Sequence, residues 1–155
     1  MTPELRDELQ QRKPFGSLYQ EAQLNLGRTQ AVLQDAFERM LKPFEISGTQ
    51  YNVLRILRGA GTNGLCRNEI RDRLVTRMPD VTRLLDRMEE AGLVARTRGV
   101  DDRRLVTTRL TERGRELVDS LDAPVEAEHR RALGHMSEQQ LRALIELLTL
   151  ARRAG

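Results

Sequence analysis

The stretch RMPDVTRLLDR, residues 77–87, constrains the fold most, because together with the residues just after it, it combines an apolar stripe with a polar face. Placed at about 100° per residue, its apolar residues recur at the i, i+3, i+4 and i+7 spacing of a buried helix face. They are Val81, Leu84, Leu85 and Met88. The opposite face carries Pro79, Thr82, Arg83, Asp86 and Glu90. We therefore expect a short helix that Pro79 enters in its first turn and whose polar face offers hydrogen bonds as well as charge.

The residues after this segment form an arginine-rich stretch with the sequence GLVARTRGVDDRRLVTTRLTERG. Gly92 is expected to end the helix, and two runs punctuated by apolar residues flank a polar tip. The sequence predicts a two-stranded hairpin with arms at 93–98 and 105–110 and a tip at 99–104.

The hairpin tip places Asp101 and Asp102 next to Arg103 and Arg104. We expect at least one of these carboxylates to hold an arginine through a bidentate pair, which would orient the guanidinium. A hairpin that follows a helix-turn-helix is called a wing. An arginine of a wing can enter the narrow minor groove of DNA while the preceding helix occupies the major groove.

Two further helices before this unit complete a helix-turn-helix pattern. Ser47 stands three residues before Gln50, a capping box that opens a helix over 51–58. Three glycines, at 59, 61 and 64, make a turn. The next helix is expected over 67–74, with Cys66 at the position where a serine or threonine cap is usual. Two short helices joined by a tight turn, the second with an exposed polar face, are typical of DNA-binding proteins.

The flanking segments predict helices that would leave apolar surface exposed in a single chain. One long helix covers 17–41 and ends at Pro43, a second starts at Thr111 and is interrupted at Pro124, and Ser137 caps the last. The last helix has two leucine-rich stripes, so we expect a two-fold dimer formed by these three helices. The predicted fold is mainly α with a small β hairpin, a winged helix-turn-helix with N- and C-terminal dimerisation helices. Its expected divisions are an arm and dimerisation helix (1–48), the DNA-binding domain (49–113) and C-terminal dimerisation helices (114–155).

The net charge of +3 is modest, but the charge is unevenly distributed. Residues 49–115 hold 15 arginines against 9 acidic residues, whereas the rest of the chain holds 11 basic and 14 acidic residues. A basic centre with acidic flanks is expected when only the middle of a chain faces a polyanion. Genome composition could explain the preference for arginine over lysine, but it does not explain the clustering.

Composition also argues against several other classes of protein. The chain has 155 residues, enough for one domain of ordinary size, and it contains no long apolar run and a polar N-terminus, so we expect a cytoplasmic protein without a membrane partner. The single Cys66 argues against a disulfide or a zinc site built from several thiolates. The sequence shows no catalytic triad order, phosphate loop or metal cluster. We therefore expect that the protein is not an enzyme and binds no cofactor. A helical interaction module without DNA binding is the remaining alternative, and it would not explain the wing.

Four motifs in this order resemble the MarR family of bacterial transcriptional regulators: TQYNVLRIL, PDVTRLLDRMEEAGLV, DDRR and LTERG. The resemblance extends over residues 17–153. It implies a homodimer on a pseudo-palindromic operator in double-stranded DNA, usually a repressor, often released by a small aromatic or phenolic effector or by oxidation.

The resemblance also implies site residues. Those expected to bind DNA are Arg67, Asn68, Arg77, Pro79, Asp80, Thr82, Arg83, Arg87, Arg98, Asp102, Arg103 and Arg104. Tyr19 and Tyr51 are candidates to line an effector pocket between the dimer helices and the DNA-binding part, although a tyrosine on an apolar helix is more commonly part of the core. The family's peroxide-sensing cysteine lies early in the first helix, where this chain has none. Cys66, at a helix N-terminus, could form a redox switch or be an inert packed thiol.

Overall fold

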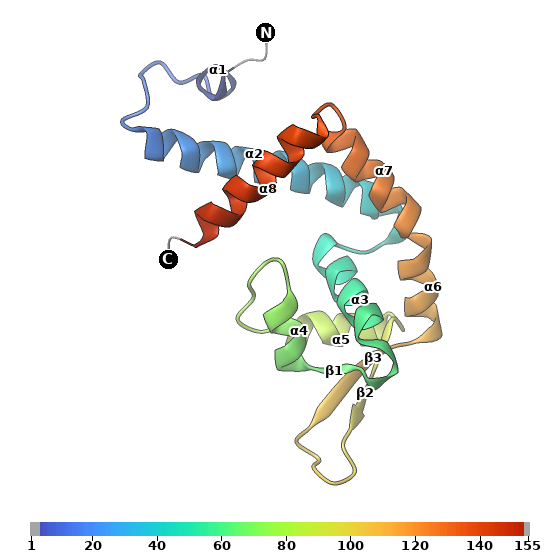
Figure 1. The fold of residues 1–155 in the computed structure, drawn as a ribbon. Helices are drawn as coiled ribbons and strands as arrows, with labels where there is room; N and C mark the ends of the chain where they lie inside the picture. The colour runs from blue at the N-terminus through green and yellow to red at the C-terminus, as the bar shows by residue number, and fades with distance from the viewer. Residues whose placement is uncertain (1–3, 154–155) are drawn as a thin grey trace.

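A computed structural model describes residues 4–153 of the chain. The helices are α1 (Leu5–Glu8), α2 (Leu18–Leu41), α3 (Gly48–Ala60), α4 (Arg67–Arg73), α5 (Thr82–Glu90), α6 (Glu112–Ser120), α7 (Asp122–Leu133) and α8 (Glu138–Arg152). The strands are β1 (Leu65–Cys66), β2 (Val94–Arg98) and β3 (Val106–Leu110), and two 3-10 turns cover Lys42–Phe44 and Gly61–Asn63. In Figure 1, α2, α7 and α8 occupy the upper part of the view, while α3, α4, α5 and the sheet lie below, with the hairpin pointing away from the upper helices.

Serine caps precede three helices, and α3 (Gly48–Ala60) is longer at both ends than the predicted 51–58. The Ser47 hydroxyl accepts a hydrogen bond from the backbone N–H of Gln50 at 3.2 Å, and the Gln50 side chain accepts one from the Ser47 N–H at 2.9 Å. Ser137 and Gln140 repeat this capping box at the start of α8. Ser17 caps α2, which ends at Leu41, immediately before the 3-10 turn that contains Pro43.

The long helix predicted after Thr111 is interrupted, as expected, near Pro124. Helix α6 ends at Ser120 and α7 begins at Asp122, so that Pro124 lies in the first turn of α7, where its missing N–H has no helical partner to lose. The break gives the chain a bend between the winged helix-turn-helix and the segment formed by α7 and α8, visible at the right of Figure 1.

The sheet has one strand more than the sequence predicts. Strands β2 and β3 form the expected antiparallel hairpin, with Val94 opposite Leu110 and Arg98 opposite Val106. A third strand, β1, pairs with β3 through Leu65 opposite Thr108 and Cys66 opposite Thr107, so the strand order is β1-β3-β2. The expectation of a two-stranded hairpin was therefore incomplete, because two residues are too few to show an alternating pattern.

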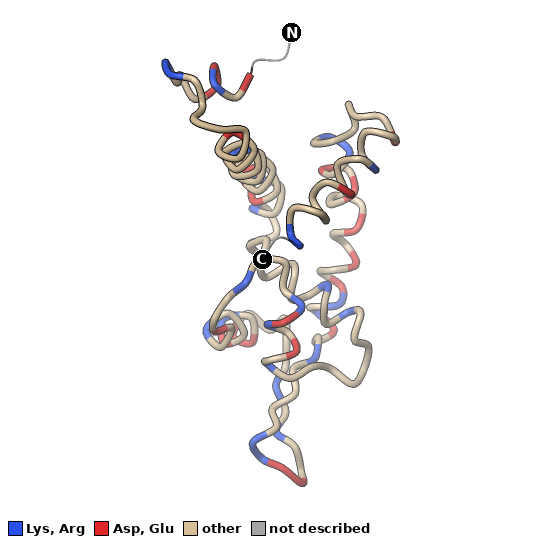
Figure 2. The backbone as a smooth tube through the Cα atoms, turned by 60° about the vertical axis from the view of Figure 1, so that its left-hand side comes forward, with Lys and Arg blue, Asp and Glu red and all other residues tan. Residues whose placement is uncertain are grey.

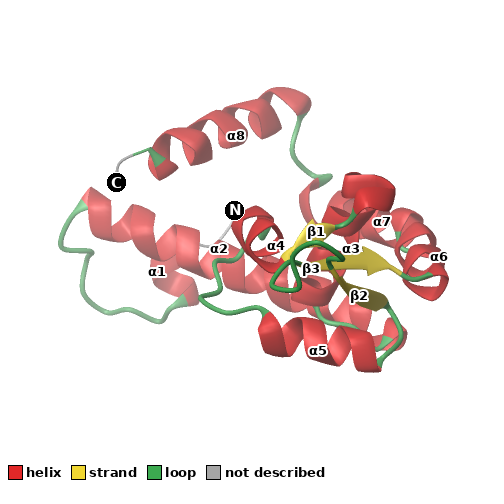
Figure 3. Cartoon of the chain, turned by 90° about the horizontal axis from the view of Figure 1, so that it is seen from below, coloured by secondary structure: helices red, strands yellow, loops and turns green. Residues whose placement is uncertain are grey.

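The hydrophobic core is formed by the inner faces of the helices and strands of the winged helix-turn-helix, and it extends to the bend between α6 and α7. Its fully buried side chains include Val53, Leu54, Leu57, Ile70, Val81, Leu85, Met88, Val94, Val118 and Leu121. Helix α8 does not belong to this core, because none of its residues is buried and Ile145, Leu147 and Leu150 are each more than 60% exposed. Figure 3 shows α8 standing apart from the other helices. The single chain thus leaves an apolar helix face in solvent.

Thr111 and Gly114, both in the LTERG motif, join α6 to the start of the wing. The Thr111 hydroxyl donates to the carbonyl oxygen of Gly92 at 2.6 Å and accepts from the N–H of Gly114 at 3.0 Å. A Cβ atom on Gly114 would overlap the carbonyl oxygen of Leu93. The motif therefore requires a residue without a side chain where the helix meets the strand.

We expect Gly114→Ala to lower the free energy of unfolding by about 1 to 3 kcal/mol, since the added methyl must displace backbone in a packed region. Gly59→Ala is the matched control, because Gly59 also lies in a helix and a Cβ there would meet nothing within 4 Å. Alanine is a better helix former than glycine, so the control should be slightly stabilised. Urea unfolding of both variants measures the difference, and equal stabilities would contradict the close approach.

Candidate nucleic-acid interface

Helix α5, the second helix of the helix-turn-helix and its candidate recognition helix, begins later than the sequence predicts. It starts at Thr82, and Arg77 and Pro79 lie in the preceding loop, so the expectation that Pro79 enters the first turn was wrong. The Asp80 carboxylate accepts hydrogen bonds from the backbone N–H of Thr82 at 2.9 Å and from its hydroxyl at 2.6 Å. An aspartate that bonds to the backbone two residues ahead favours a turn over a helix, and this turn sets the start of α5.

Hydrogen bonds connect the first turns of α4 and α5. Arg67, the first residue of α4, donates to the Thr82 hydroxyl at 3.3 Å, and Thr82 donates in turn to Asp80. The bonds from Thr82 hold the pKa of Asp80 below its usual value, so its carboxylate is ionised at neutral pH. A polar depression of about 120 Å³ lies between α4 and the segment that precedes α5, lined by Arg67, Asn68, Arg71, Pro79, Asp80 and Val81. The helix-turn-helix therefore offers donors and acceptors within one small area.

The exposed face of α5 carries guanidinium groups. Val81, Leu85 and Met88 are buried as predicted and Leu84 is half-buried, while Arg83 and Arg87 are exposed one turn apart. Gly92 ends the helix with a φ of 72°, as the sequence predicts, and the N–H of Leu93 bonds back to the carbonyl of Met88 at 2.9 Å. The helix thus presents two arginines on the side opposite the core.

The wing tip is built differently from the expectation. Among the described residues, neither Asp101 nor Asp102 forms an ion pair with Arg103 or Arg104, so the predicted bidentate clamp was wrong. The Asp102 carboxylate accepts instead from the backbone N–H of Arg104 at 2.9 Å, because a short side chain in a tight turn reaches its own backbone more easily. Both arginine side chains remain exposed at the end of the hairpin, where Figure 2 shows basic and acidic residues together.

The predicted DNA-binding residues lie in two groups, one on the helix-turn-helix and one on the wing. The helix-turn-helix group is Arg67, Asn68, Pro79, Asp80 and Thr82, joined by the contacts above. Arg83 and Arg87 extend it along α5, and Arg77 lies in the loop before this helix. The wing group is Arg98, at the end of β2, with Asp102, Arg103 and Arg104 at the tip.

Two structural arginines were missed by sequence reasoning. Arg96 on β2 pairs with Asp86 and Glu89 of α5, so Asp86, expected to face outward, is already bonded within the protein. Arg58 on α3 pairs with Asp119 at 2.9 Å and with Asp122 at 2.8 Å, on either side of the break between α6 and α7. The period of two along β2 places Arg96 on the same face as buried Val94, and that signal could have indicated an inward-pointing arginine.

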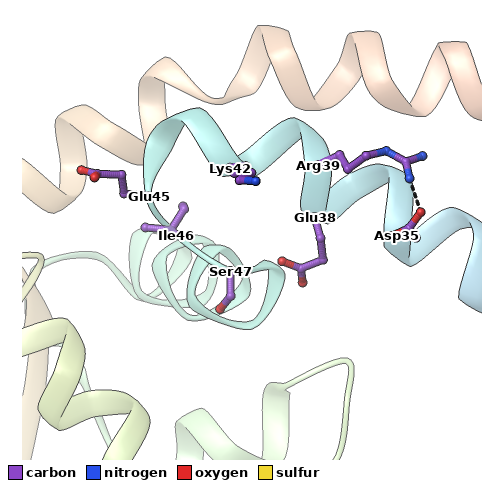
Figure 4. Close-up of a pocket in the computed structure, with 7 residues that line it drawn as sticks. All are labelled: Asp35, Glu38, Arg39, Lys42, Glu45, Ile46 and Ser47. Atoms are coloured by element: carbon purple, nitrogen blue, oxygen red, sulfur yellow. Dashed lines mark hydrogen bonds and ion pairs between the residues drawn. The ribbon is translucent and has the colours of Figure 1, made fainter.

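The two tyrosines proposed for an effector pocket lie far apart in the structure of the single chain. Tyr19 is 89% exposed in the first turn of α2, whereas Tyr51 on α3 packs edge-on against Phe37, near the other end of α2, with ring centroids 5.6 Å apart. Burial raises the pKa of the Tyr51 hydroxyl. A shallow depression of about 380 Å³ lies where α2 meets α3, lined by Asp35, Glu38, Arg39, Lys42, Glu45, Ile46 and Ser47 (Figure 4). Neither tyrosine lines it.

Cys66 lies at the junction of β1 and α4. It is a free, half-buried thiol, and its backbone N–H donates to the Glu69 carboxylate at 2.8 Å. The bond from Cys66 lowers the pKa of Glu69. Glu69 therefore supplies one half of a capping box at the start of α4, with Cys66 at the N-cap position.

The fold and this surface define a winged helix-turn-helix protein whose recognition helix and wing expose arginines on one side. The model of the MarR family matches residues 46–106, which span α3 to the beginning of β3. The chain belongs to the MarR family of DNA-binding transcriptional regulators, whose members are regulators rather than enzymes. Within residues 4–153, no helix has the length and apolar character that crossing a bilayer requires.

Known relatives support this membership. YfiV of Bacillus subtilis (strain 168), an uncharacterised HTH-type transcriptional regulator, is 32% identical over 126 residues, covering 81% of this chain and 76% of YfiV. The crystal structure of a MarR transcription factor from Planctomyces limnophilus has 43% identity and a TM-score of 0.69, covering 88% of this chain and 99% of that one. The repressor CouR bound to a 23-mer DNA duplex has 27% identity and a TM-score of 0.76, covering 91% and 99%. CouR from Rhodococcus jostii RHA1 bound to p-coumaroyl-CoA has 26% identity and a TM-score of 0.71, covering 86% and 93%.

Proposed function

We propose that the protein is a ligand-responsive repressor that acts as a homodimer on a pseudo-palindromic operator. The observation that supports this most is the placement of exposed Arg83 and Arg87 on α5 beside a wing tipped by Arg103 and Arg104. A helix of this kind fits the major groove, and wing arginines fit the adjacent minor groove. We assign DNA binding to residues 49–113 and dimerisation to the segments 1–48 and 114–155. Its site of action would be the cytoplasm, because the target is chromosomal DNA.

Dimerisation is supported by the apolar surface that the single chain leaves in water. Leu18 at the start of α2 is 81% exposed, and Leu147 and Leu150 on α8 are 64% exposed each. Burying a leucine side chain is worth about 1.5 to 3 kcal/mol relative to leaving it in solvent, so several together favour association strongly. A second copy that covers the α2 and α8 faces would also hold two recognition helices about one turn of DNA apart, roughly 34 to 36 Å.

An effector response is supported by the position of the depression where α2 meets α3. It lies between the proposed dimerisation helix and the DNA-binding part, and its lining includes charged side chains at the rim and Ile46 at the base of the loop. CouR, a relative at 26% identity, has been crystallised with p-coumaroyl-CoA. We propose a small aromatic or phenolic effector for this chain, which would change the spacing of the two recognition helices when it binds near this junction.

Fluorescence anisotropy with labelled duplexes at several salt concentrations tests the DNA-binding function. Most of the phosphate contacts would come from arginines, and about six per dimer predict a slope of roughly −5 for log affinity against log salt. Duplexes selected by the wild-type protein from a random pool should bind more tightly than unselected ones. A protein that binds no duplex at moderate salt would contradict the proposal.

A further inference from the structure

Arg96 on β2 makes an unusual set of hydrogen bonds to the recognition helix. Its backbone N–H donates to Glu89 Oε2 at 3.0 Å, and its Nη2 donates to Glu89 Oε1 at 2.9 Å and to Asp86 Oδ1 at 2.6 Å. The Arg96 side chain is 24% exposed, compared with 46% for Asp86 and 41% for Glu89. One arginine therefore binds two carboxylates of α5 from a neighbouring strand.

These carboxylates lie close to the surface that would meet DNA. Asp86 follows Thr82 and Arg83 by one helical turn, so the three residues share one side of α5. An unpaired carboxylate at this position would repel the phosphates of a bound duplex. Glu89 lies one turn further from the start of α5 than Asp86 does, toward the strand that carries Arg96.

The pairing with Arg96 also affects the ionisation of Glu89. The hydrogen bond from the Arg96 side chain holds the pKa of Glu89 below its usual value, and the same contact raises the pKa of Arg96. Other arginine–carboxylate pairs join residues one turn apart within the same helix. Examples are Arg130 with Glu126 on α7 and Arg142 with Glu138 on α8. The Arg96 pairs instead connect the base of the wing to the recognition helix.

We propose that Arg96 is a positioning residue of the DNA interface, which masks the negative charge of Asp86 and Glu89 so that a duplex can approach α5. This inference rests on the proposed DNA-binding function. Arg96 itself contacts no base in this role, and it acts through the two carboxylates. Its loss should therefore weaken binding to any sequence, whereas loss of a base-contacting side chain should weaken binding to selected sequences only.

A double-mutant cycle tests the masking. Its four proteins are the wild type, Arg96→Met, Asp86→Asn with Glu89→Gln, and the triple variant, each measured for affinity to a random-sequence duplex by anisotropy. At about 0.1 M salt we expect Arg96→Met to bind about tenfold more weakly, because it exposes charge within a few ångströms of the phosphates. Neutralising both carboxylates should then strengthen binding about tenfold in the Arg96→Met background, but by no more than about threefold in the wild type.

Arg130→Met is the matched control, since it also breaks an arginine–carboxylate pair, on α7 and away from the wing. Thermal unfolding followed by circular dichroism shows that each variant is folded. Where Arg96→Met does not fold, Arg96→Lys completes the cycle, with a smaller coupling expected because lysine makes fewer hydrogen bonds.

The outcomes separate this inference from the proposed function. If the wild type binds no duplex, the proposed function fails. If the wild type binds and Arg96→Met behaves like Arg130→Met, or if neutralisation has the same effect in both backgrounds, the masking role is overturned. Weaker binding by the Asp86→Asn, Glu89→Gln variant would also overturn it, because the carboxylates would then be contributing to DNA contact.

Discussion

Leu147→Glu combined with Leu150→Glu is expected to make the protein monomeric and to weaken binding to a two-half-site duplex by about 10² to 10⁴-fold. Both side chains are 64% exposed in the single chain, so charging them should not disturb its core. Two carboxylates in an apolar interface between subunits would have to lose their hydration, which a helix-to-helix contact cannot replace. Once the subunits separate, each recognition helix must bind without the help of the other.

Light scattering coupled to size-exclusion chromatography measures the oligomeric state, and anisotropy measures affinity for duplexes with one and with two half-sites. Affinity for a single half-site should change little. Arg152→Glu is the control, because Arg152 is exposed and lies about 140 to 160° around α8 from both leucines, so it places a carboxylate on the opposite side of the helix. A variant that stays dimeric would show that these leucines lie outside the interface. A monomer that binds two half-sites as tightly as the wild type would contradict the role of dimerisation.

Arg83→Ala is expected to cost about 1 to 3 kcal/mol of binding free energy on a selected duplex and much less on a random one. Arg83 is exposed in the first turn of α5, where side chains of a recognition helix reach base edges. A bidentate contact between arginine and guanine contributes about 1 to 3 kcal/mol of discrimination between bases. Without it, the protein should prefer the selected sequence less strongly. The ratio of the two dissociation constants, measured at one salt concentration, reports the effect.

Arg103→Ala and Arg104→Ala provide the comparison for Arg83→Ala. Both arginines lie at the exposed tip of the wing, where contact with phosphates and the minor groove is insensitive to most of the sequence. They should weaken binding to selected and random duplexes by similar factors and reduce the salt slope. If Arg83→Ala also lowers both affinities equally, Arg83 contacts the backbone and not the bases.

The parts of this fold that the sequence predicts are those that depend on residues close together in the chain. The Ser47–Gln50 and Ser137–Gln140 boxes act over three residues, and the stripe of Val81, Leu85 and Met88 recurs at the helical period, so helix starts and buried faces were correctly expected. The hairpin was also predicted, because its arms are separated by a short polar tip.

The errors arise where a side chain chooses between partners. The sequence does not show that Asp80 bonds to Thr82 and delays the start of α5, or that Asp102 bonds to the backbone and leaves the arginines of the tip unpaired. Strand β1 depends on pairing with Thr107 and Thr108, about forty residues away, which a two-residue pattern cannot reveal. The bond between Asp86 and Arg96 likewise requires the relative placement of a helix and a strand.

Arg58 restricts the motion of α7 relative to α6. Its guanidinium donates to Asp119 at the end of α6 and, through both terminal nitrogens, to Asp122 at the start of α7. Rotation about the break at Leu121 would separate these carboxylates, so the ion pairs would have to rupture together. The Arg58 bonds therefore oppose any change in the angle between α6 and α7, and so they hold α7 in one orientation relative to the winged helix-turn-helix.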